Sequence, residues 1–344
     1  MLILRNVGEL TGCCGGLEIT EMRRVRFENI HKYTQLIRDF VTEPRKQRTL
    51  LKNRPTWYQL CSSLDVIEDS ALAIEAYSRL ESAVEPGPKY LAVYGLLQAL
   101  VLQQDAVRYL CAALALEDIV GQYPRLREIR QVRHDVAGHP TKRGPQKGRP
   151  ESYHAVSRVT LGPGGFQLLS NYSDGHSKIR HINVPKLIQD QEQCVTHALH
   201  RVVELLGVEV AAHKAKFRGE KLVECFPEAW AYYASKLAEG AYNRDKVHAR
   251  GALASAESLA DMLDAFRQTL AGRGIELDTY DSVKLLYDEL EYPLMELKSF
   301  FEALTQGKES EIDHRAMYIF AWYVKAKVGE LRDIAEEIDA EYAK

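Results

Sequence analysis

The chain has 344 residues, of which 46% are hydrophobic and 27% charged, and its formal net charge is −3 at pH 7. This composition is typical of a globular protein of about two domains, and it excludes a disordered, collagen-like or low-complexity chain. No apolar run approaches the ~20 residues that a membrane span needs, and the first residues do not resemble a signal peptide. The sequence therefore predicts a cytoplasmic protein with no membrane partner.

Apolar residues at spacings of three and four predict helices through the first part of the chain. The third of these helices is apolar almost all round, as is typical of a central helix in a bundle. Gly138 and Pro140 end the fourth helix, because glycine favours helix ends and proline cannot continue a helix. The predicted helices cover residues 17–42, 55–81, 89–117 and 124–137.

The periodicity then changes from helical spacing to the alternation expected of strands. Two turns rich in glycine, Gly162-Pro163-Gly164-Gly165 and Ser173-Asp174-Gly175, separate three short apolar segments. These features predict a small antiparallel meander over about 153–184, with strands at 154–161, 166–172 and 176–184. Pro185 then begins a long helix to about Leu206.

The last part of the chain is helical and acidic. Residues 221–344 contain 15 Lys and Arg against 24 Asp and Glu, whereas residues 1–220 contain 30 against 24. Predicted helices cover about 220–239, 244–271, 279–305 and 310–342. We predict a helical domain with the meander at 1–219 and an acidic, all-helical domain at 220–344. The fold class is mainly α.

The final helix carries an apolar stripe suited to packing against a neighbouring helix. We expect this stripe to pack against other helices of the same chain. The alternative is that it packs against a partner in a dimer. Its members are Met317, Phe320, Val324, Val328, Leu331, Ile334 and Ile338.

Several classes of enzyme are disfavoured because their motifs are absent from the sequence. There is no phosphate-binding loop, no dinucleotide fingerprint, no nucleophile elbow and no His-Glu-x-x-His. The six cysteines, among them the adjacent Cys13 and Cys14, form no Cys-x-x-Cys pair. His197 and His200 lie three residues apart on one helix, but no third ligand has useful spacing. We therefore expect no metal and no cofactor.

One basic segment is the main candidate for chemistry. Residues 125–149 contain eight Lys and Arg against two acidic residues, so the segment is either a phosphate-binding surface or a solvated loop. Within it, Arg133 is followed directly by His134, and His139 lies six positions after the arginine. This pattern resembles the signature of the HEPN superfamily, in whose ribonucleases an arginine is followed, after four to six residues, by a histidine.

The resemblance covers about residues 55–210 and implies a HEPN-like helical bundle, here decorated by the meander. It also implies a metal-independent endoribonuclease in a toxin or antiviral-defence setting, acting as a homodimer with paired motifs and with a possible antitoxin or regulatory partner. Arg133 and His139 would be the catalytic pair, and His134 the polar helper. The minimal nucleotidyltransferase that accompanies many such proteins is not encoded in this chain.

The residue types suit RNA cleavage on physical grounds as well. Attack by the 2′-hydroxyl on the adjacent phosphate needs a group that moves protons near neutral pH, which His139 supplies. It also needs a cation for the transition-state charge, which the guanidinium of Arg133 supplies. In a continuous α-helix these two residues lie about 240° apart, so Gly138 must redirect the chain or two subunits must share the site.

Other basic residues around the motif are candidates for binding RNA phosphates: Arg130, Lys142 and Arg143. Gln104 and Asp105 on the third predicted helix are weaker candidates for supporting the site. Two alternatives stay open. In one, the motif only caps a helix, because cations suit a helix C-terminus, and the protein is a non-catalytic interaction or scaffold protein. In the other, the protein binds RNA without cleaving it.

Overall fold

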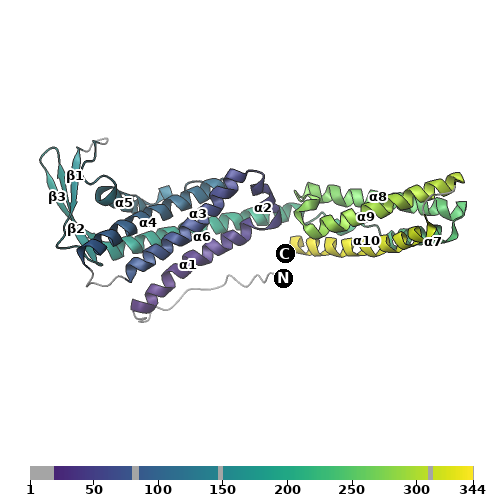
Figure 1. Ribbon diagram of the computed structural model, residues 1–344, viewed down its shortest axis with the longest axis horizontal. Coiled ribbons are helices and arrows are strands. Elements are labelled where there is room, and N and C mark those ends of the chain that lie inside the picture. Colours follow the sequence, from purple (N-terminus) through teal and green to yellow (C-terminus); the bar gives the residue numbers. More distant parts are fainter. Residues whose placement is uncertain (1–18, 80–84, 146–149, 309–312, 344) are drawn as a thin grey trace. The chain divides into compact units, whose positions relative to one another are not determined.

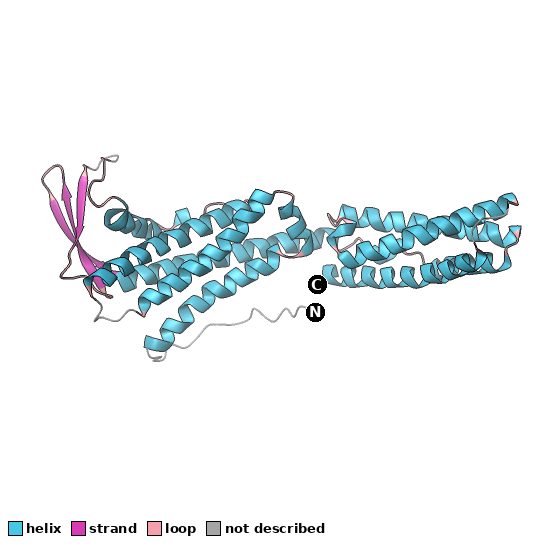
Figure 2. Ribbon diagram, viewed as in Figure 1, coloured by secondary structure: helices cyan, strands magenta, loops and turns pink. Residues whose placement is uncertain are grey.

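The computed structural model describes residues 19–79, 85–145, 150–308 and 313–343, so Cys13 and Cys14 lie outside the described residues. The described chain is mainly helical, with a small three-stranded antiparallel sheet (Figure 2). It divides into two compact units. The first contains the described residues up to Phe40 and within Asn53–Glu204, and the second contains Val41–Lys52 and the described residues from Leu205 onward.

The helices of the first unit follow the predicted apolar periodicity. Proline occupies the first turn of α3, α4 and α5, where its missing N–H is not needed for the helix. Helix α4 therefore begins at Pro86, three residues before the predicted start at residue 89. The helices are α1 (Ile19–Val41), α3 (Arg54–Ser78), α4 (Pro86–Ala113), α5 (Pro124–Arg133) and α6 (Val184–Phe217), and their arrangement can be followed in Figure 1.

Apolar packing and a few polar contacts hold these helices together. Buried side chains of α3 and α4, including Leu64, Ile67, Leu97 and Leu100, form much of the core. Three buried glutamines join α4 to α6, because Gln191 accepts from Gln104 at 2.8 Å and donates to Gln103 at 2.9 Å. On α1, Arg38 pairs with Asp65 and Glu68 of α3.

The sheet has the predicted meander order, β1 (Ser152–Val156), β2 (Gly165–Tyr172) and β3 (Ser177–Asn183). The first strand is shorter than predicted, and Val159 is 95% exposed in the turn that follows it. The ladder ends because the hydroxyl of Thr160, in place of a backbone carbonyl, accepts the hydrogen bond from the Gln167 N–H at 2.9 Å.

One face of the sheet turns toward the protein, as the two-residue period of strands requires. Phe166, Leu168 and Ile182 are buried at one end of this face. Gly165 makes the hairpin possible, because it has φ of +143° and its Cα lies so close to the Ile182 carbonyl that a side chain would clash. The other end of the same face is polar and is described below.

Two further helix boundaries differ from the predicted ones. The predicted helices leave residues 43–54 uncovered, but Pro44–Leu51 form α2, which Glu43 caps by accepting hydrogen bonds from the Arg45 and Lys46 N–H groups. Helix α6 does not end near Leu206 but continues through Gly207 to Phe217. A glycine inside a helix costs only about 1 kcal/mol relative to alanine, so it does not by itself end the helix. The division between the units falls within this continuous helix, whereas the shift in charge placed the boundary after residue 219.

The second unit contains four long helices in which each packs on the next and the last packs back on the first, as in a four-helix bundle. Five of the seven stripe residues on the last helix are buried and the other two pack against the core, so burial within the chain is confirmed. No helix among the described residues is long and apolar enough to cross a membrane. The four are α7 (Trp230–Asn243), α8 (Lys246–Gly272), α9 (Asp281–Gln306) and α10 (His314–Ala343).

The predicted helix at 220–239 is wrong in its first half. A 3-10 turn at Leu222–Cys225 comes first, and the chain is then extended at Phe226 before α7 begins. The carboxylate of Asp339 accepts the Leu222 and Val223 N–H groups at 2.9 and 3.0 Å, so a residue far along the chain holds this turn.

Candidate functional site

The end of α5 changes from an α-helix to a π-helical turn at His134–Gly138. The backbone N–H of His139 donates to the carbonyl oxygen of His134, five residues earlier, at 2.8 Å. A π-helical turn is wider than an α-helical turn and is often found at functional sites. Here the wider turn brings His139 back over His134, which an α-helix would not do.

Three side chains gather around Gly138. The rings of His134 and His139 are parallel within 4°, with centroids 6.2 Å apart. A Cβ atom on Gly138 would lie 3.2 Å from both Arg133 Nη1 and His134 Nδ1, so both side chains approach the bare glycine. His139 is exposed, and Arg133 and His134 are half-buried. The three predicted residues therefore lie together on an accessible part of the surface.

Gln98 of α4 fixes the orientation of Arg133. Its Oε1 accepts hydrogen bonds from Arg133 Nε at 3.1 Å and Nη2 at 2.9 Å. The remaining terminal nitrogen, Nη1, is the one that approaches Gly138. Gln98 was not predictable from the sequence, because nothing in the local pattern indicates that α4 and α5 pack together at this point.

Two of the three predicted phosphate-binding residues pair with carboxylates near the surface. Arg130 donates to Asp105 of α4, so Asp105 does support the motif helix, and Lys142 pairs with Glu151 at 2.9 Å. Gln104, the other weak candidate, is buried in the core of the first unit instead.

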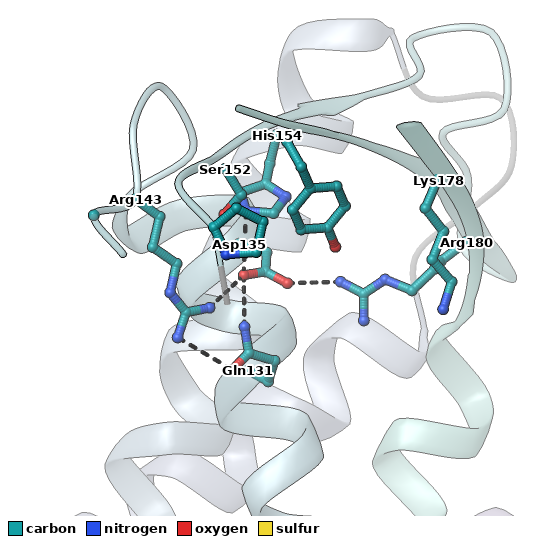
Figure 3. A pocket seen from close by; sticks show the side chains of 10 residues that line it. Gln131, Asp135, Arg143, Ser152, His154, Lys178 and Arg180 are labelled. Atoms are coloured by element: carbon teal, nitrogen blue, oxygen red, sulfur yellow. Dashed lines mark hydrogen bonds and ion pairs between the residues drawn. The ribbon is translucent and has the colours of Figure 1, made fainter. Parts of the chain in front are cut away.

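Arg143, the third predicted phosphate-binding residue, belongs to a cluster around a buried carboxylate (Figure 3). Asp135 is only 2% exposed. Its Oδ1 accepts from Arg143 Nη1 at 2.7 Å and from Gln131 Nε2 at 2.8 Å, and its Oδ2 accepts from Arg180 Nη2 at 2.6 Å. Asp135 thus joins the π-helical turn to the loop after it and to β3. Such hydrogen-bonded pairing is what allows a carboxylate to be buried.

His154 of β1 lies under this cluster. Its Nδ1 is 2.9 Å from the hydroxyl of Ser170, and its Nε2 is 3.1 Å from the hydroxyl of Ser152 and 3.5 Å from Asp135 Oδ1. Burial lowers the pKa of His154, and the charges of Arg180 and Arg143 lower it further against the opposing effect of Asp135.

The pKa of His134 is also lowered. Burial is the main cause, and the positive charges of Arg133 and Arg143 add to it. Because the ordinary pKa of histidine is about 6.5, His134 is neutral at neutral pH and has a free nitrogen lone pair. It can therefore accept a proton or a hydrogen bond beside His139.

These shifts predict how the stability of the first unit depends on pH. Both histidines have a lower pKa in the folded protein than in the unfolded chain, so unfolding takes up protons below about pH 6.5. We expect the thermal midpoint of the first unit to fall as the pH decreases from 7.5 to 5.5, a window above the titration of most carboxylates. The thermal midpoint should change less per pH unit in His154→Gln than in His181→Gln. His181 is an exposed histidine on β3 and serves as the control. A midpoint that rises on acidification, or equal slopes in the two variants, would contradict this expectation.

No group of three or more potential metal ligands occurs among the residues that the structure describes. His197 and His200 have ordinary partners within the first unit. The Nδ1 of His197 is 2.5 Å from the hydroxyl of Tyr123, and the ring of His200 lies 5.2 Å from that of Tyr33.

No family model, no curated protein and no solved structure matches this chain. The function is therefore inferred from the residue types of the motif and from the way Arg133, His134 and His139 gather around Gly138.

Proposed function

We propose that the protein is a metal-independent endoribonuclease of the HEPN type. The observation that carries this proposal is the π-helical turn at His134–Gly138, which gathers an arginine and two histidines at one accessible place. Guanidinium and imidazole are the groups that metal-free RNA cleavage needs. The biological setting that fits is a toxin or an antiviral-defence protein.

In the proposed reaction the 2′-hydroxyl of the RNA attacks the adjacent phosphorus. The bond from O2′ to phosphorus forms, and the bond from phosphorus to O5′ breaks. His139 takes the proton of the 2′-hydroxyl and returns a proton to O5′ as the bond from phosphorus to O5′ breaks. His134, kept neutral by its surroundings, orients His139 or accepts the 2′-hydroxyl proton in its place. Arg133, oriented by Gln98, stabilises the additional negative charge on the phosphate oxygens. The products are a 2′,3′-cyclic phosphate and a 5′-hydroxyl.

The test is an RNA cleavage assay in EDTA, with total RNA and tRNA as substrates and with the product ends mapped. Cleavage that survives EDTA and leaves cyclic phosphate ends supports the proposal. Cleavage that EDTA abolishes, or products with 3′-hydroxyl ends, would contradict it. If the folded protein only binds RNA, with an affinity that falls as salt rises, the non-catalytic alternative is favoured.

A homodimer fits the exposed face of α4. Leu91 and Leu102 are 75% and 44% exposed, and their spacing places them on the same helix face as Gln98. Covering this face with a second copy would bury apolar surface and bring two motifs near each other, with a two-fold interface. We expect Leu102→Lys to decrease the dimer fraction in sedimentation velocity. A wild-type chain that remains monomeric at micromolar concentration would contradict the dimer.

Gly138→Ala tests the geometry of the site without removing a chemical group. The new Cβ would crowd Arg133 Nη1 and His134 Nδ1, so one or both must move by some tenths of an ångström. We expect the cleavage rate to fall about tenfold or more, because small displacements of catalytic groups are costly. The thermal midpoint should change little, since Gly138 has no positive φ. Gly87→Ala, at an uncrowded position of α4, is the matched control.

A further inference from the structure

A second site lies at the polar end of the inner sheet face, on the side of the π-helical turn that carries Asp135. A cleft of about 360 Å³ opens there between the π-helical turn, the loop after it and the three strands. Neither Arg133 nor His139 lines this cleft. Its charged and aromatic lining residues are Asp135, Arg143, His154, Tyr172, Lys178 and Arg180 (Figure 3).

The strand register explains why these residues share one face. Lys178 and Arg180 are two positions apart on β3, so both point to the same side of the sheet. Lys178 pairs with Ser170 in register, and Ser170 pairs with His154 on β1. The cleft therefore combines side chains from all three strands with the buried carboxylate of Asp135.

The charge of the cleft is positive. Its lining contains three cationic side chains, Arg143, Lys178 and Arg180, and one carboxylate, that of Asp135. Both oxygens of that carboxylate already accept hydrogen bonds. His154 does not add a further charge at neutral pH, because its pKa is lowered. A cleft lined by more cationic than anionic side chains attracts an anion.

Hydrogen-bond donors remain available for that anion. Among the described residues, Arg180 contacts only Asp135 as an acceptor, and it does so through Nη2 alone. No described carboxylate lies within ion-pair distance of the exposed Lys178. A guanidinium with unused N–H groups beside an ammonium group is a common arrangement for binding phosphate.

We propose that this cleft binds the phosphate of a nucleotide. Its volume is within the range of small-ligand sites, and the ring of Tyr172 in its wall offers an apolar surface for a base or a ribose. The phosphate comes either from a free nucleotide or from an RNA strand. The proposal requires binding only, so it stands whether or not the protein cleaves RNA.

Equilibrium binding by the full chain tests the proposal with AMP, with adenosine as the probe that lacks phosphate, and with a short 2′-O-methyl RNA that cannot be cleaved. Lys178→Glu should weaken binding of the phosphate-bearing probe about tenfold or more, the effect of losing one hydrogen bond between charged groups. Arg158→Glu is the matched control, since Arg158 is exposed in the turn after β1 and does not line the cleft. Thermal midpoints check that both variants are folded.

Binding of AMP that depends on Lys178 supports a free nucleotide as the ligand, and binding of the oligonucleotide alone that depends on Lys178 supports an RNA strand. Absence of binding by both probes at millimolar AMP and micromolar oligonucleotide would overturn the proposal. Equal losses of affinity in Lys178→Glu and Arg158→Glu would also overturn it. The probe would then be attracted by the positive charge of the protein surface in general and not by the cleft. The cleavage assay in EDTA is read separately, so failure of one proposal is distinguishable from failure of the other.

Discussion

Replacing His139 by alanine is expected to lower the rate of RNA cleavage by about 100- to 10,000-fold, the usual contribution of a positioned acid or base. The fold should be unaffected, because the His139 side chain is exposed and the hydrogen bond that closes the π-helical turn comes from its backbone. The measurement is the initial rate of cleavage of a defined RNA in EDTA.

The matched control is His181→Ala, which removes another exposed histidine of the same unit. It should cleave at the wild-type rate. Expression of the wild type should slow the growth of cells, and His139→Ala should relieve this effect. If His139→Ala cleaves RNA as fast as His181→Ala, or is equally toxic, the assignment of His139 is wrong.

Replacing Asp135 by alanine is expected to destabilise the first unit by about 3 kcal/mol. Removing one partner of a buried ion pair leaves the other charges without compensation, and this is among the costliest single changes. Here the change would remove the carboxylate that Arg180 pairs with and one partner of Arg143, since the charged ends of both lie against Asp135. Urea unfolding followed by circular dichroism measures the loss, and hydrogen exchange locates it.

Two comparisons distinguish charge from packing at this position. Asp135→Asn keeps the volume of the side chain but not its charge, so most of the destabilisation should remain. Asp69→Ala removes an exposed carboxylate on α3 and should change the free energy of unfolding by less than about 0.5 kcal/mol. Faster exchange in Asp135→Ala should be concentrated in β1, β3 and the π-helical turn. Similar effects of Asp135→Ala and Asp69→Ala would mean that the cluster contributes little to stability.

The helical fold was largely predictable from local sequence. Apolar spacing identified all the α-helices of the described residues except α2, and prolines lie at the starts of several of them. The meander was also predictable, because glycine-rich turns separate three alternating segments. These features depend on interactions within a few residues along the chain, which the sequence displays directly.

Two of the wrong boundaries have a common cause. The 3-10 turn before α7 depends on the carboxylate of Asp339, and β1 ends where the Thr160 hydroxyl takes the place of a backbone partner. Each of these two boundaries is decided by a contact between residues that are not neighbours along the chain, so the local pattern does not reveal it.

The sequence by itself determined the residue types of the candidate site, the helix that carries them and the glycine around which they gather. Only the tertiary structure decided that the helix would widen into a π-helical turn, that Gln98 would orient Arg133, and that Arg180 would meet Asp135. The last two contacts join residues far apart along the chain, and the π-helical turn, although local, contains Asp135, whose carboxylate is held by Arg180 of β3. Their geometry follows from how helices and strands pack, and packing depends on all the side chains at once.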